Sequence, residues 1–144
     1  MKGFIPHIYR DGQPKGWKYM EASAIGDCQI GLALKVTSGK LAKAGSTDVP
    51  AYIAMYKGTV AAGDVIPVMP VDGSVEFETE LSVQNTSIAV GAKYTIDTTG
   101  MMITATTASG VAEVIEADGT AAGSRVLVRF DRAAVAQDAA AAKA

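Results

Sequence analysis

The stretch Val75–Leu81 (VEFETEL) is the clearest structural signal in the chain, because apolar or β-branched residues alternate along it with glutamates. Alternation with a period of two is typical of a β-strand that buries one face and exposes the other. Valine, phenylalanine, threonine and leucine share one face of such a strand, and three carboxylates share the other. We therefore expect Val75–Leu81 to be a half-buried strand with a charged face, suited to solvent or to arginine partners.

Further short β-type runs surround this strand and are separated by glycine-containing turns. They are Val65–Met69, Lys93–Asp97 and Arg125–Phe130, with turns at Asp72-Gly73, Thr99-Gly100 and Asp118-Gly119. Upstream, another strand begins near Gln29, carries its bulky residues on one parity, and ends at a Ser38-Gly39 turn from which residues 40–42 can return as a hairpin. This spacing predicts a compact all-β domain.

Two details of these runs predict how they pair. Pro67 and Pro70 cannot donate ladder hydrogen bonds, so the run that contains them should lie at a sheet edge or be broken by a bulge. Arg125 and Arg129 share the face opposite the apolar residues of their run. Cross-strand ion pairs between these arginines and the glutamates of residues 75–81 are therefore geometrically possible, each worth about 0–1 kcal/mol where exposed.

Residues 1–20 differ in character from the rest of the chain. Glycines and prolines interrupt any long element there, while several large apolar side chains stand among them. Such a segment is stable only when it lies on another surface, so we expect an extended N-terminal arm that contacts a neighbouring subunit; the alternative is that it wraps its own domain. The expected interface residues are Phe4, Ile5, Ile8, Tyr9, Arg10, Trp17 and Tyr19.

The length of 144 residues indicates one domain with appendages. We expect three parts: the extended arm at 1–20, a β-domain at 21–130, and a short Ala-rich C-terminal tail at 131–144. The tail has high helix propensity without an apolar stripe, which predicts a frayed end or a short surface helix.

The charge content is low and unevenly distributed. Hydrophobic residues make up 49% of the chain and charged residues 19%, which predicts that a partner covers part of the surface. Four basic residues against one acidic residue lie in 1–20, whereas five acidic residues and no basic one lie in 60–80. These regions could attract one another between copies or could be two solvated surfaces.

The sequence offers little for catalysis. His7 and Cys28 are the sole histidine and the sole cysteine, so serine or cysteine triads and histidine or cysteine metal clusters are not expected, and no cofactor is expected. No P-loop is present, and the pI of about 5.3 opposes nucleic-acid binding by the whole domain. No signal peptide or membrane span is recognisable, which favours synthesis in the cytosol.

Four segments resemble the head-decoration, or capsid-cement, proteins of tailed bacteriophages. They are Ala33–Ala44, Ala61–Val68, Val90–Gly100 and Ala122–Val128, within residues 29–130. The resemblance implies a β-barrel or β-tulip-like domain, a homotrimer, and a non-enzymatic structural role. It also implies the major capsid protein as partner, with binding at capsomer junctions on the outer surface of the virion after synthesis in the host cytoplasm.

Two other classes of function remain open. One is a β-module of a phage fibre or adhesin that binds glycans or a host surface, which would need a groove lined by aromatic residues. Outside the arm the aromatic residues are few: Tyr52, Tyr56, Phe77, Tyr94 and Phe130. The other class, with less support, is a small enzyme. Neither nucleic acid nor membrane is an expected partner.

Overall fold

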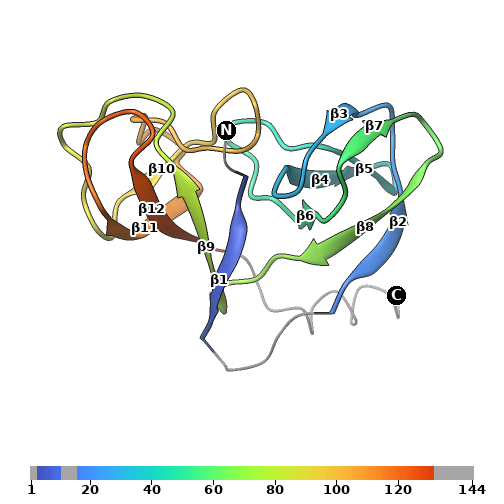
Figure 1. The fold of residues 1–144 in the computed structure, drawn as a ribbon, viewed down its shortest axis with the longest axis horizontal. Coiled ribbons are helices and arrows are strands. Elements are labelled where there is room, and N and C mark those ends of the chain that lie inside the picture. The colour runs from blue at the N-terminus through green and yellow to red at the C-terminus, as the bar shows by residue number, and fades with distance from the viewer. Residues whose placement is uncertain (1–2, 11–15, 132–144) are drawn as a thin grey trace.

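The computed structural model describes residues 3–10 and 16–131, and the predicted tail at 131–144 lies outside them except for Asp131. The described part of the chain is all-β, as predicted: it contains strands β1 to β12 in three sheets and no helix. Figure 1 shows two groups of strands side by side along the longest axis, with β1 and β9 between them. The arrangement is sandwich-like, and no closed barrel forms within the described residues.

The first sheet contains the predicted charged strand, which lies next to the edge strand. Its spatial order is β1 (Ile5–Tyr9), β9 (Val75–Glu80), β12 (Arg125–Phe130), β11 (Ala112–Ala117) and β10 (Lys93–Tyr94). All four pairings are antiparallel, and β1 has a register shift between Pro6 and Ile8. The glutamates of β9 point to one side of this sheet and its apolar residues to the other, as the alternation predicted.

The second sheet is built from the middle of the chain. Its spatial order is β2 (Lys18–Glu21), β8 (Val65–Pro70), β6 (Tyr52–Ala54), β4 (Ala33–Thr37) and β5 (Lys40–Lys43), and β3 (Gly26–Cys28) pairs with β7 (Gly58–Val60) in a third sheet. The predicted hairpin is confirmed between β4 and β5. Ser38 and Gly39 both have positive φ, as a tight hairpin turn requires.

The proline-containing strand β8 corrects a sequence prediction, because it lies inside the sheet between β2 and β6 rather than at an edge. The carbonyl oxygen of Pro67 accepts a hydrogen bond from the Met55 amide at 3.0 Å, just beyond the end of β6. The backbone nitrogen of Pro70 points toward β2. The paired part of β2 begins at Lys18, opposite Val68, so Pro70 lies beyond the residues that β2 pairs with. Both prolines therefore occupy positions where the ladder is ending and little is lost without an N–H group.

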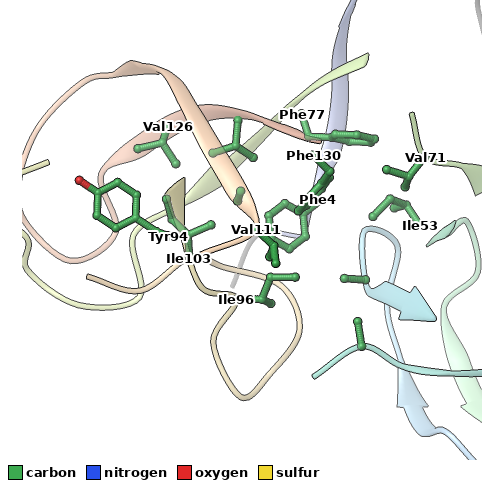
Figure 2. Close-up of a cluster of buried hydrophobic side chains, with 14 of the residues drawn as sticks. Phe4, Ile53, Val71, Phe77, Tyr94, Ile96, Ile103, Val111, Val126 and Phe130 are labelled. Atoms are coloured by element: carbon green, nitrogen blue, oxygen red, sulfur yellow. The ribbon is translucent and has the colours of Figure 1, made fainter. Parts of the chain in front are cut away.

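The main core lies between the first and second sheets. Phe130 packs against Phe4 and Phe77, with ring centroids 5.1 and 5.6 Å apart respectively. Figure 2 shows these three rings together, with Ile53 and Val71 approaching from the side of the second sheet. A second cluster of buried residues lies on the other face of that sheet and includes Leu34, Leu41, Tyr52, Ile66 and Val68. The second sheet is therefore buried on both faces at its centre.

The N-terminal residues do not form a separate extended arm in the described part of the chain. Residues 5–9 are the outer strand of the first sheet, and residues 18–21 are the outer strand of the second. The structure thus has the alternative arrangement, in which this segment wraps its own domain. Pairing with β9 and β8 supplies the hydrogen bonds that an isolated arm would lack.

Candidate interaction surfaces

The seven residues predicted to form an interface lie in three different environments. Phe4 is fully buried in the main core, and Tyr9 packs against that core with its hydroxyl 3.9 Å from the Met69 sulfur. Phe4 is therefore not available to a partner, which corrects its assignment as an interface anchor. Its burial reflects the T-shaped contact with Phe130, which covers the apolar ring better than any surface position would.

Three of the seven lie along the outer side of the first sheet. Ile5 pairs with Glu78 and is half-buried, whereas Ile8 pairs with Glu76 and is exposed. Arg10 donates from Nε to Oε2 of Glu76 at 2.7 Å. Arg10 is thus engaged within its own chain, and Ile8 is the apolar side chain of this group that a partner could reach.

Trp17 and Tyr19 are the predicted residues that remain most accessible. Their exposed fractions are 58% and 71%, which are high for aromatic side chains. Val65, with 61% exposed, lies nearby because Tyr19 pairs with Pro67 and Glu21 pairs with Val65 on the neighbouring strand. We call Trp17, Tyr19 and Val65 the β2 surface. Val65 was missed by sequence reasoning, although its two-residue spacing from Pro67 places both on one face of the strand.

The outer face of the first sheet carries the ion pairs that the sequence predicted in part. Nε of Arg125 donates to Oε1 of Glu78 at 2.7 Å, and its Nη1 lies 3.3 Å from Asp118 and 3.6 Å from Glu116. One guanidinium group therefore faces three carboxylates from three parts of the sheet. The Arg125–Glu78 pair is partly buried and therefore stabilises the sheet more than the contacts of Arg125 with the exposed Glu116 and Asp118 side chains do.

Two further ion pairs lie on this face. Nε of Arg129 lies 3.0 Å from Oε1 of Glu113 rather than reaching a glutamate of β9, which corrects that part of the prediction. Glu113 is directly opposite Arg129 on β11, whereas Glu76, which the β12–β9 register places on the other side of Arg129, is bound by Arg10. Nζ of Lys93 lies 3.2 Å from Asp131. This face therefore carries positive and negative side chains together rather than a patch of one charge sign.

A second exposed apolar region lies in the connection between β9 and β10. Val83 and Val90 are both exposed there, and Figure 1 shows this connection at the end of the molecule away from β2. The connection is held by backbone hydrogen bonds, including those from the Asn85 amide to Thr120 and from the Gly91 amide to Val114. Two separate apolar regions are therefore held on one frame, near opposite ends of its longest axis.

The chemistry-bearing side chains are scattered rather than gathered. Among the described residues no three His, Cys, Asp or Glu side chains are placed to hold a metal ion. His7 lies in the irregular part of β1 with Nδ1 4.0 Å from Glu78, a carboxylate that Arg125 already binds. Cys28 is fully buried, and burial, followed by the charge of Asp27, raises the pKa of its thiol to about 11.

Comparison with known proteins does not assign the chain to a family. No family model matches the chain, and no curated protein matches it. Within the described residues no helix could cross a membrane.

Proposed function

We propose that the protein is a non-enzymatic structural protein that binds the outside of a phage capsid lattice and stabilises it at capsomer junctions. The observation that supports this proposal is the pair of exposed apolar regions, the β2 surface and the β9–β10 connection, near opposite ends of one all-β frame. A protein that braces two neighbours needs two contact regions held at a fixed separation. Exposed apolar side chains that gather into a contiguous patch mark contact sites.

The mechanism follows from mass action. A protein that binds the assembled lattice and not its separated subunits stabilises the lattice by its free energy of binding. Many identical sites multiply the effect over the shell. Self-association, as the homotrimer that the resemblance implies, would add effective concentration where the spacing of the copies matches that of the lattice.

The test is co-sedimentation of the purified full-length chain with empty phage capsids. Truncation of residues 1–20 is unsuitable, because it removes β1, most of β2, and the Phe4 ring from the core. Instead, Trp17→Ala/Tyr19→Ala and Val83→Ser/Val90→Ser alter one surface each, and Val36→Ser alters an exposed valine outside both. We expect saturable binding at a fixed ratio, weakened by either double variant and unchanged by the control. Absence of saturable binding to any shell would contradict the proposal.

The glycan-binding alternative has one observation in its favour, the exposed aromatic pair Trp17 and Tyr19 two positions apart. Same-face residues of an extended strand are about 6.6 Å apart, close enough to stack on one oligosaccharide. Trp17 is the sole tryptophan, so its fluorescence reports directly on such stacking. A saturable fluorescence change with a glycan, lost in Tyr19→Ala, would support this alternative over capsid binding.

A further inference from the structure

Part of the backbone beside and within the outer strand β2 has no hydrogen-bond partner among the described residues. In an antiparallel ladder, residues alternate between positions bonded to the neighbour and positions that point away from it. The Ala22 amide bonds to the Asp64 carbonyl on the β8 side, and the Pro67 carbonyl bonds to Met55 on the other side of β8. By this alternation Lys18 bonds to β8, whereas the N–H and C=O groups of Trp17 and Tyr19 point outward. No described residue hydrogen-bonds to the backbone of Trp17 or Tyr19 on that side.

Further along β2 the outward side is already occupied. Ala22 forms a parallel bridge with Leu41 of β5, and the Ser23 amide donates to the Leu41 carbonyl at 2.9 Å. Glu21 also forms an ion pair with Lys40 at 3.0 Å. The open part of the edge is therefore the short stretch Trp17–Tyr19.

The other outer strands of the two large sheets carry features that discourage pairing with another chain. β1 contains Pro6 and a register shift beside it. β10 has two residues, and β5 begins and ends with Lys40 and Lys43. Proline, bulges, short length and lysines are the usual protections of sheet edges. The stretch Trp17–Tyr19, at the start of β2, instead presents two aromatic rings beside backbone groups that no described residue pairs with.

We propose that this open edge is where a second copy of the chain pairs, strand β2 against strand β2, about a two-fold axis at Lys18. The outward positions 17 and 19 are symmetric about residue 18, so antiparallel pairing joins Trp17 of each copy to Tyr19 of the other. Pairing centred on Tyr19 would instead bring Trp17 against Glu21, where β5 already lies. Lys18 is thus the position at which two free edges are complementary.

The side chains favour this occupant over an unrelated extended peptide. Cross-strand aromatic pairs stabilise antiparallel strands, and the symmetric contact makes two Trp–Tyr pairs at once. Both rings, largely exposed in the single chain, become part of one four-ring cluster. The cost is that Lys18 lies opposite Lys18 of the second copy, so the association should strengthen as salt screens that repulsion.

A β2–β2 pair would cover the same rings that the capsid proposal places against the lattice, so these rings make one contact or the other, and the pair forms whether or not the protein binds a capsid. A β2–β2 contact closes at two copies, so it differs from the three-fold contact that the resemblance implies. The two can therefore fail separately. Self-association is measured on the purified protein alone, and lattice binding is measured with capsids.

The first experiment is disulfide cross-linking of the full-length chain. In the proposed pair the two residues 18 form a non-hydrogen-bonded pair with Cα atoms about 4.5 Å apart, within disulfide range. The two residues 21 would be about 20 Å apart. Under mild oxidation we expect a linked dimer for Lys18→Cys and none for the matched control Glu21→Cys. The native Cys28 is fully buried and should not interfere. Equal cross-linking of both variants, or of neither, would overturn the proposal.

The second experiment uses charge. In a dimer of the natural chain, Lys18 lies opposite Lys18, and in a dimer of the Lys18→Glu variant two glutamates lie opposite each other. In a mixed dimer of the two chains, lysine lies opposite glutamate. Changing a repulsive cross-strand pair to an attractive one should tighten association about 2- to 30-fold in the mixture over either chain alone. Sedimentation velocity at low salt measures this. A mixture that associates no better than the separate chains would contradict pairing about Lys18.

Discussion

The backbone of Gly31 crosses that of Gly3 so closely that a Cβ atom on Gly31 would lie 2.6 Å from the Gly3 Cα atom. The amide of Phe4, the residue after Gly3, donates a hydrogen bond to the Gly31 carbonyl at 2.9 Å. This crossing fixes the N-terminal segment against the second sheet just before Phe4 enters the core. It makes residues 3–10 part of the domain.

The crossing predicts that Gly31→Ala is strongly destabilising. Gly31 has φ +98°, so alanine there is strained and its methyl group also meets the Gly3 backbone. We expect a loss of about 2–5 kcal/mol in the free energy of unfolding, measured by urea denaturation. Gly63→Ala is the matched control, with φ +92° and nothing within 4 Å of the added atom, and should lose about 1–2 kcal/mol. Equal losses would show that the crossing is not tight.

The N-terminal aromatic residues should separate into structural and surface groups. Phe4→Ala leaves a cavity beside Phe77 and Phe130 and should cost about 3–5 kcal/mol of stability. Trp17→Ala and Tyr19→Ala alter exposed rings and should change stability by about 0.5 kcal/mol or less at concentrations where the chain is monomeric. Thermal denaturation of the three variants measures the change in stability for each group. A stable Phe4→Ala protein would contradict the described core.

The parts of the fold that the sequence predicted are those that depend on local patterns. The alternation in Val75–Leu81 identifies β9 and its charged face, and the Ser38-Gly39 turn identifies the β4–β5 hairpin. The Arg125–Glu78 pair was also foreseeable, because both residues lie on the polar faces of alternating strands. In each of these cases neighbouring residues carry the information.

The parts that could not be predicted depend on distant contacts. Phe4 is buried because β1 pairs with a strand some seventy residues later and because Gly31 allows the close crossing. Ile30 and Val36 share a parity with the buried Leu34 but are exposed, since they flank or end the strand where the core no longer covers it. Local periodicity does not determine which strands pair with each other. The sequence therefore predicts an N-terminal arm where the structure has two paired strands.

The Arg125 cluster should contribute salt-sensitive stability. Arg125→Met removes the cation that faces Glu78, Glu116 and Asp118, leaving carboxylates that repel one another. We expect a loss of about 1–2 kcal/mol at low ionic strength. The loss should be smaller in 1 M salt, where repulsion is screened. Urea denaturation at both salt concentrations measures it. An effect that is independent of salt would contradict an electrostatic role.

Arg129→Met is the comparison variant for this cluster. Its guanidinium lies 3.0 Å from Glu113 and 3.5 Å from the Gly73 carbonyl, so its removal leaves fewer neighbouring carboxylates. We expect a smaller and less salt-dependent loss than for Arg125→Met. The reverse order would indicate that packing of the arginine stems, rather than charge, governs the outer face.

The buried thiol gives a prediction about reactivity. Cys28 is fully buried and its Sγ lies 3.4 Å from the Tyr56 carbonyl oxygen, to which it can donate. Burial, reinforced by Asp27, raises the pKa of the thiol to about 11, so little thiolate is present at neutral pH. Because Cys28 is the sole cysteine, labelling by a thiol reagent reports on one site. We expect labelling to be slow in native buffer and fast in denaturant; fast native labelling would contradict the burial.

The same shift predicts a loss of stability at high pH. The thiol ionises near 9.0 when it is in its ordinary environment and near 11 when folded, so the unfolded chain loses its proton first as pH rises. The contribution to stability is therefore fully present below pH 9 and falls between pH 9 and 11. Cys28→Ala lacks the titrating group, so its stability should fall less over this window. Urea denaturation at pH 8, 9 and 10 of both chains isolates the thiol as the difference between their slopes. Parallel slopes would show that Cys28 is already accessible to water in the folded protein.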